Sequence, residues 1–342
     1  MAGPARYSFI FSKVKAKESR LLSCEQLKSL LKAGNISELA LQLAGTYYEE
    51  MFASEMEPEE RERIIWEKDI TLHKELIKHL KGREKKIVEM FLERYDLDKL
   101  KAILRVWFNK DKAGGVSWVS SDICFHFDTE KLPRAANIND FILLLKDTPY
   151  MKALAEAKSD FQQFNNLFYL EWALEKDYLK RTVSLIKTLP LSERAALMKI
   201  WGLEIDIANV SFILRTRKYY RGSKEFLQHH LISETGRIKE EDMQEAFLKD
   251  SSDLLEYFLS KLQIRSGEPP LLASSAGGEI EYLLFYILMQ RARAALGGYP
   301  FSIAVVVAFL VLKYLETKNV ISIFYSCLYG LDRTQKERLV IC

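Results

Sequence analysis

A short helical pattern occurs three times in this chain of 342 residues. The three copies align without gaps and begin at Asp96, Asp206 and Glu316, so that successive copies are 110 positions apart. In each copy the acidic residue is followed by apolar residues at positions +4, +7 and +8, which lie on one face of a helix. Because repeated helical units bury a core that they share, the pattern predicts a fold of three related helical parts.

Each part also contains a predicted helical hairpin, in which a polar break separates two apolar runs. The first runs end in related tripeptides: Leu30-Leu31-Lys32, Leu144-Leu145-Lys146 and Phe247-Leu248-Lys249. Ser23 and Gln26 have the spacing of a capping box in front of the first hairpin. We therefore divide the chain into three repeats, 1–110, 111–221 and 222–342, and expect the second to begin with a linker loop.

The turn-forming residues favour an all-α fold. The chain has only 15 Gly and 8 Pro, too few for many short strands. The stretch 116–127 is the one segment with strand-like residues, and one short hairpin there would not change the class. The most apolar stretch, Ile303 to Leu312, has about half of the ~20 residues that a membrane-spanning helix needs, so we interpret it as a core helix.

Composition argues against nucleic-acid binding and against a disulfide framework. The 50 basic and 47 acidic side chains nearly balance, so no strong positive field attracts nucleic acid. The four cysteines have no paired spacing, which is typical of a reducing compartment. One local basic cluster occurs, and a solvated helix end explains it without a function; its members are Arg215, Arg217, Lys218, Arg221 and Lys224.

No catalytic, cofactor-binding or metal-binding residue is predicted. The chain has no G-x-x-x-x-G-K-[ST] loop, no G-x-G-x-x-G loop and no G-x-S-x-G elbow. Cys124 and His126 could offer two ligands to zinc, but no second Cys/His pair completes a tetrahedral site.

The repeated acidic residues are the main candidate site. Asp96, Asp206 and Glu316 lie at the edge of the apolar face, where buried carboxylates usually pair with Arg or cap a neighbouring helix. A structural role, one in each repeat, is the simplest interpretation; partner contact and acid–base catalysis are the alternatives. Four further repeat positions accompany them: Asn209, Asn319, Arg105 and Arg215.

Three segments carry a resemblance to a known family. The C-terminal stretch Tyr299 to Val320, with its Pro300-Phe301 pair and apolar helix, looks like the end of the C subunit (also called the d-type subunit) of the V-type and A-type rotary ATPases. The middle stretch Leu203 to Arg215 resembles the same element in the family's middle repeat, and the start, Tyr7 to Leu31, is similar to the family's N-terminal pattern. The third copy departs from the pattern, since Tyr325 stands where the first two copies have Arg105 and Arg215.

The resemblance implies a funnel-shaped body of three helical domains around a pseudo-threefold axis. It implies a non-catalytic central-stalk subunit that joins the rotating shaft subunits D and F to the membrane proteolipid ring, on the cytoplasmic face, with membrane contact only through the ring. The coupling of ATP chemistry to proton or sodium translocation follows from that position. Tyr and Arg are common binding anchors, so the end of the second repeat is a candidate interface: Arg217, Lys218, Tyr219, Tyr220 and Arg221.

Two other classes remain open. An all-α repeat scaffold would bind peptides or proteins along an open concave face and keep its first and third repeats apart. An unrecognised helical enzyme would need a deep polar pocket with convergent perturbed side chains. An adaptor that surrounds an axis should instead bring the first and third repeats together.

Overall fold

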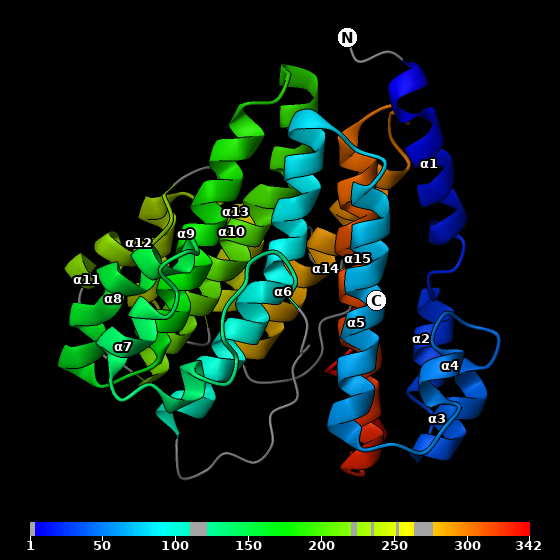
Figure 1. The fold of residues 1–342 in the computed structure, drawn as a ribbon, viewed down its shortest axis with the longest axis horizontal. Helices are drawn as coiled ribbons and strands as arrows, with labels where there is room; N and C mark the ends of the chain where they lie inside the picture. The colour runs from blue at the N-terminus through cyan, green and yellow to red at the C-terminus, as the bar shows by residue number, and fades with distance from the viewer. Residues whose placement is uncertain (1–3, 110–121, 220–223, 234–235, 251–252, 263–275) are drawn as a thin grey trace. The chain divides into compact units, whose positions relative to one another are not determined.

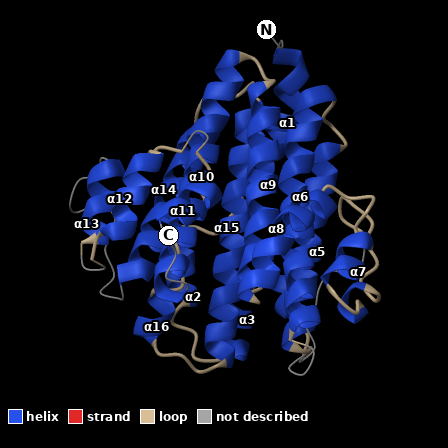
Figure 2. Cartoon of the chain, turned by 90° about the vertical axis from the view of Figure 1, so that its left-hand side faces the viewer, coloured by secondary structure: helices blue, strands red, loops and turns tan. Residues whose placement is uncertain are grey.

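Every regular element of the described structure is a helix (Figure 2). The structure is a computed structural model and describes residues 4–109, 122–219, 224–233, 236–250, 253–262 and 276–342. No strand occurs within these ranges, so the all-α prediction is confirmed. Of the strand-like stretch, 116–121 lies outside the described residues, and 122–127 is irregular loop.

The chain divides into two compact units, and the residues of each can be followed by colour in Figure 1. One unit combines residues Met1–Thr46 with Ile186–Cys342, and the other is the continuous segment Tyr47–Leu185. The first unit therefore joins the two ends of the chain. The division into three repeats at 110 and 221 stays a prediction.

The continuous unit is built around the long helix α6. Trp107 of α6 packs its ring against Phe141 and Phe161, and its indole N–H donates to the Ala135 carbonyl at 2.9 Å. These contacts attach the short helices α7 and α8 to the end of α6. The helices of this unit are α4 (Glu49–Phe52), α5 (Pro58–Ile77), α6 (Gly82–Phe108), the 3-10 helix η1 (Leu132–Arg134), α7 (Ile138–Leu143), α8 (Tyr150–Phe164) and α9 (Phe168–Lys187, whose last two residues fall in the other unit).

The unit that joins the chain ends is built around α15. This helix is apolar on all sides and is buried along most of its length, as a helix in the middle of a bundle must be. The predicted core segment Ile303 to Leu312 forms its first half. The helices of this unit are α1 (Pro4–Glu18), α2 (Cys24–Leu30), α3 (Ile36–Leu43), α10 (Leu191–Tyr219), α11 (Lys224–His230), α12 (Glu240–Leu248), α13 (Leu254–Leu262), α14 (Ala276–Leu296), α15 (Ile303–Leu328) and α16 (Arg333–Glu337).

Helices from both ends of the sequence surround α15. The N-terminal helices α1, α2 and α3 pack on it, as do α10, α14 and α16. The first and last parts of the chain are therefore in direct contact. Within the described residues, no helix combines the length and the apolar character that crossing a membrane requires.

The predicted hairpins are present as helix pairs α2–α3, α7–α8 and α12–α13. The predicted capping box in front of the first pair is also present. The Ser23 hydroxyl accepts from the Gln26 N–H at 3.1 Å, and the Gln26 side chain accepts from the Ser23 N–H at 2.8 Å.

Candidate functional site

The three repeated carboxylates lie one on each of the long helices α6, α10 and α15. All three are buried: Asp96 and Asp206 are 0% exposed, and Glu316 is 5% exposed. Because an ionised carboxylate cannot be buried without partners, the contacts of each one reveal its role.

Asp96 binds the loop that precedes α7 and α8. Its Oδ2 accepts hydrogen bonds from the backbone N–H groups of Cys124 at 3.1 Å and Phe125 at 2.9 Å. The Tyr150 hydroxyl, at the start of α8, lies 3.5 Å from the same oxygen. One carboxylate on α6 therefore fixes both the approach to the hairpin and the hairpin itself.

Asp206 makes the equivalent contact in the unit that combines 1–46 with 186–342, which we call the joined unit. It accepts from the backbone N–H groups of Arg237 at 2.9 Å and Ile238 at 3.2 Å, just before α12. Gly236 precedes them, and a Cβ at Gly236 would lie 2.3 Å from Asp206 Oδ1. Glycine is required there because the loop passes too close to the carboxylate for any side chain.

Glu316 binds the segment that precedes α2. Its Oε2 accepts from the Leu22 backbone N–H, and its Oε1 accepts from the Lys313 ammonium at 2.9 Å. Lys313 is itself buried, so this pair is an internal one. Leu22 and Glu316 are 294 positions apart in the sequence.

The three contacts follow one rule, and we call each of them a carboxylate clamp. A long helix presents a buried carboxylate to backbone N–H groups of the segment that precedes a helical hairpin: α6 to α7–α8, α10 to α12–α13, and α15 to α2–α3. The first two helices hold the hairpin that follows them in the chain, whereas the last one holds the first hairpin. Backbone N–H groups bind all three carboxylates, and Glu316 also pairs with Lys313, whereas the sequence left open a pairing with Arg or the capping of a neighbouring helix.

The repeated asparagines reinforce two of the clamps. The Asn209 amide donates to the Ile232 carbonyl and accepts from the Ile232 N–H, both at 2.9 Å. The Asn319 amide likewise donates to the Ile341 carbonyl at 2.7 Å and accepts from the Ile341 N–H at 2.9 Å. We call each such pair of hydrogen bonds a bracket. In the first copy the corresponding residue is Lys99, whose ammonium lies 5.1 Å from the centre of the Phe127 ring.

A sequence signal for these brackets existed and was missed. Ile123, Ile232 and Ile341 are spaced 109 positions apart, and each is followed by Cys or Ser. The last two are the bracketed residues, and Ile123 directly precedes the loop that Asp96 binds. The signal is short because each bracket holds the backbone N–H and C=O groups of a single isoleucine.

Burial controls the electrostatics of two clamps. Burial raises the pKa of Asp96 to about 6, against the opposing effect of the Phe125 and Cys124 N–H groups. Burial likewise raises the pKa of Asp206 to about 7, although the Arg237 and Ile238 N–H groups and the Arg237 charge lower it. Such pKa values suit acid–base chemistry in an open cleft, but these carboxyls are 0% exposed and bound to backbone. Their geometry is that of structural groups.

The repeated arginines lie away from the clamps. Arg105 is 57% exposed and pairs with Glu171 at 2.6 Å. Arg215 is exposed on α10. In the third copy Tyr325 stacks on Tyr329, with ring centres 6.0 Å apart, so an aromatic contact replaces the charge.

The candidate interface at the end of the second repeat has one described side chain with contacts. Arg217 donates to the Ala246 carbonyl at 3.1 Å and to the Lys249 carbonyl, so it caps the C-terminus of α12. Tyr220 and Arg221 lie outside the described residues, as do the side chains of Lys218 and Tyr219. Arg217 therefore has an internal role, and the cluster as an interface stays a prediction.

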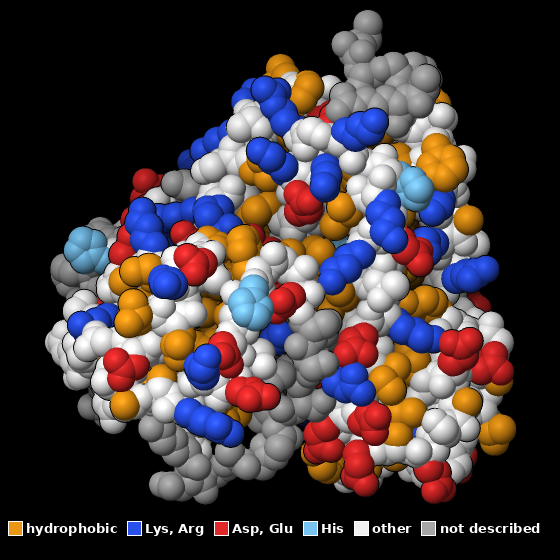
Figure 3. All heavy atoms as spheres, in the orientation of Figure 1, with side chains coloured by type: hydrophobic (Ala, Val, Ile, Leu, Met, Phe, Trp, Pro, Cys, Tyr) orange, Lys and Arg blue, Asp and Glu red, His pale blue; other side chains and the backbone are white. Residues whose placement is uncertain are grey.

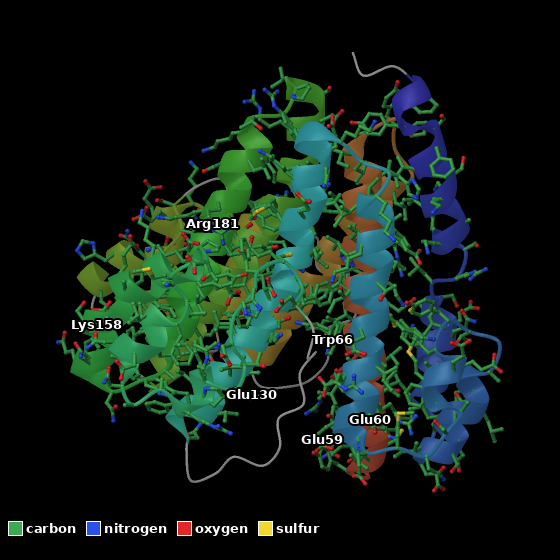
Figure 4. All side chains as sticks on the ribbon, in the orientation of Figure 1. Glu59, Glu60, Trp66, Glu130, Lys158 and Arg181 are labelled. Carbon is green, nitrogen blue, oxygen red and sulfur yellow. The ribbon has the colours of Figure 1, made fainter. Side chains whose placement is uncertain are left out.

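A buried ion pair stabilises the continuous unit. Arg181, which extends from α9 in Figure 4, binds both oxygens of Glu93 at 2.5 and 3.0 Å and also Asp177 at 2.6 Å. Glu93 is only 3% exposed as a side chain. The side-chain hydrogen bonds and the charges of both carboxylates outweigh burial and raise the pKa of Arg181.

Acidic side chains gather where α5 begins (Figure 3). Glu59 and Glu60, labelled in Figure 4, are exposed and lie in the first turn of this helix. Negative charge there is favourable because the helix dipole is positive at its N-terminus. Helix electrostatics explain this cluster.

An all-helical protein, in which buried carboxylates hold hairpins to long helices, is the class that this fold defines. The chain belongs to the ATP synthase (C/AC39) subunit family, whose model matches residues 10–339. The family resemblance in the sequence is therefore confirmed.

Curated relatives agree with this membership. The C subunit of the A-type ATP synthase of Methanocaldococcus jannaschii is 24% identical over 98% of this chain and 86% of its own length. That of Archaeoglobus fulgidus is 24% identical over 98% of this chain and 96% of its own length. That of Methanosphaera stadtmanae matches 62% of this chain and 54% of its own length, at 24% identity. The relatives are named as the C subunit of the synthase and not as a catalytic subunit, in accord with the prediction of a non-catalytic chain.

Proposed function

We propose that this chain is the central-stalk subunit of a V/A-type ATPase that joins the rotating shaft to the membrane proteolipid ring. The shaft partners are subunits D and F, and the work of the chain is mechanical. Its rotation with the ring couples ATP hydrolysis or synthesis to the translocation of protons or sodium ions. The relatives' name, which makes them the C subunit of an A-type ATP synthase, supports an assembly of this kind.

The observation that carries the proposal is the clamp between Glu316 and the Leu22 N–H. It fastens the first hairpin to α15, so the first and last parts of the chain are in contact. An open peptide-binding solenoid would keep its end repeats apart. A connector that surrounds a shaft needs the opposite, because a closed body resists torque without opening at a seam.

The finer geometry belongs to the same proposal. Three clamps of one kind, on three long helices, favour an arrangement of three related domains around a pseudo-threefold axis in a funnel. Such a body would lie on the cytoplasmic rim of the ring and contact the membrane only through it. Lys218, Tyr219, Tyr220 and Arg221 remain the candidate contact residues.

Purification of the native complex tests the proposal. The tagged full-length chain would be recovered from detergent-solubilised membranes of its own cells, and its partners identified by mass spectrometry. We expect proteolipid, the catalytic subunits and both shaft subunits, and a crosslinker should join this chain to ring and shaft. A tagged unrelated soluble protein is the control. Consistent recovery of soluble partners alone, without proteolipid or ATPase subunits, would exclude the role.

A matched pair of variants links the test to the clamp. Glu316→Ala removes the carboxylate that holds the first hairpin, whereas Lys318→Gln alters an exposed side chain two positions away on α15. We expect the first variant to reduce recovery of the complex and the second to leave it unchanged. Equal recovery with both variants would show that the closure of the chain does not matter for assembly.

A further inference from the structure

Two cysteines from opposite ends of the sequence meet in the joined unit. Cys24 is the first residue of α2, and its thiol is near enough to the thiol of Cys342 to raise the pKa of the latter. Both side chains are partly exposed, so a small reagent can reach them. The other two cysteines differ: Cys124 is exposed in the continuous unit, and Cys327 is buried with its sulfur 3.4 Å from the Ala33 carbonyl.

The clamp on α15 brings these two thiols together. Glu316 binds the N–H of Leu22, two residues before Cys24, and Asn319 brackets Ile341, the residue before Cys342. Glu316 and Asn319 are three positions apart on one helix, so their Cβ atoms are about 5–6 Å apart. Two backbone anchors on adjacent turns of α15 therefore fix the two cysteines side by side.

We propose that Cys24 and Cys342 are a modification site that forms a reversible disulfide with a low-molecular-weight disulfide such as glutathione disulfide. The Cys24 thiolate attacks glutathione disulfide, forms a mixed disulfide and releases one glutathione thiolate. Cys342 then loses its proton and attacks the Cys24 sulfur, which releases the second glutathione. Two protein thiols are oxidised to one disulfide, and one glutathione disulfide is reduced to two glutathione molecules.

The surroundings assign the order of these steps. Burial raises the pKa of Cys342 to about 12, and the hydrogen bond and charge of Cys24 add to the rise, whereas Lys28 and Arg293 oppose it. Cys342 therefore keeps its proton while Cys24 reacts, because only a thiolate attacks. Once Cys24 is a mixed disulfide it carries no charge. The part of the rise in the Cys342 pKa that is due to the Cys24 charge then disappears. Cys342 is then the resolving thiol.

The disulfide would join the first hairpin covalently to Cys342, whose neighbour Ile341 is held by Asn319 of α15. Its loop would contain nearly the whole chain, and the stabilisation from a crosslink grows with loop length. The thermal midpoint of the joined unit should therefore rise by several degrees on oxidation and return on reduction. The site lies outside the proposed coupling role, which neither requires it nor depends on it.

Peptide mapping of the full-length wild-type protein tests the site. The purified protein would be incubated with glutathione disulfide at pH 8, blocked with N-ethylmaleimide, and digested with trypsin without reduction. Cleavage after Arg20, Lys28 and Arg338 leaves Cys24 in 21–28 and Cys342 in 339–342. We expect these two peptides to be joined and to separate on reduction with dithiothreitol. Cys124 should not be joined to either peptide, because burial raises the pKa of its thiol and only a thiolate attacks a disulfide.

Two variants complete the design. Cys342→Ser should abolish the joined peptide, leave glutathione on Cys24 and remove the rise in midpoint. Cys124→Ser should keep both the joined peptide and the rise. The proposal would be overturned by stable glutathione or maleimide adducts on both Cys24 and Cys342 without a joined peptide. It would equally be overturned if Cys24 paired with Cys124 as readily as with Cys342.

Discussion

Replacing Asp206 with Asn separates the cost of burying an ionised carboxylate from the benefit of its hydrogen bonds to the backbone. Asp206 is fully buried, and burial raises its pKa from 3.8 to about 7 even though two backbone N–H groups bind it. At 1.36 kcal/mol for each pH unit, this rise corresponds to about 4 kcal/mol. The ionised carboxylate is therefore less favourable in the folded chain than in the unfolded chain, despite its hydrogen bonds.

The sign of the pH dependence follows from linkage. The folded chain holds the Asp206 proton more tightly than the unfolded chain, so stability is greatest below the unfolded pKa and decreases as pH rises from about 4 to 7. The Asn variant has no such titration. Its amide directs N–H groups at one of the two backbone donors, so one hydrogen bond is lost at every pH, at a cost of about 1–3 kcal/mol. The wild type should be more stable at pH 5, and its advantage should shrink by roughly 2–3 kcal/mol by pH 8.

Urea unfolding followed by circular dichroism at pH 5, 6, 7 and 8 measures this difference for the unit that contains Asp206. Asp96→Asn is the matched control in the other unit. The pKa of Asp96 is raised only to about 6, so its difference should change by roughly half as much. A wild-type advantage over Asp206→Asn that stays constant within about 0.5 kcal/mol, or that grows with pH, would refute the reasoning.

Three further substitutions test other contacts. Asn319→Ala removes both hydrogen bonds to Ile341, so the free energy of unfolding should fall by about 1–3 kcal/mol. Amide hydrogen exchange in 339–342 should become faster, and unchanged exchange would contradict this contact. Arg181→Met leaves Glu93 buried without its cation, and calorimetry should record a loss of about 3–5 kcal/mol, whereas an unshifted midpoint would count against the pair. Gly236→Ala places a Cβ against the buried carboxylate and should cost about 1–3 kcal/mol by urea unfolding. Gly34→Ala meets only ordinary contacts and is its control; equal effects would disprove the close approach.

The helical class and the three hairpins were predictable from the sequence. The periodicity of the apolar residues shows which side of each helix faces the core. The equal spacing of Asp96, Asp206 and Glu316 marks the same side in the three long helices. The same reasoning identified Ile303 to Leu312 as a core helix and Ser23 with Gln26 as a capping box.

The partners of the repeated carboxylates were not predictable in the same way. Their donors are backbone N–H groups, which every residue except proline carries, so no side chain marks the loops that contain them. The closest signal is Gly236, whose missing side chain permits contact with Asp206. Arg217 shows the same difficulty, because a basic cluster in the sequence does not reveal that one member reaches the carbonyl groups at the end of α12.

The clamp between Leu22 and Glu316 has a consequence for biosynthesis. The first hairpin leaves the ribosome early, but the helix that holds it is made 294 positions later. At about 5–20 residues per second, the hairpin waits roughly 15–60 s for its partner. During that interval its apolar face, including Leu27, Leu30 and Leu39, has no α15 to pack against. A nascent chain of this protein is therefore exposed to chaperones and proteases at this hairpin until α15 emerges.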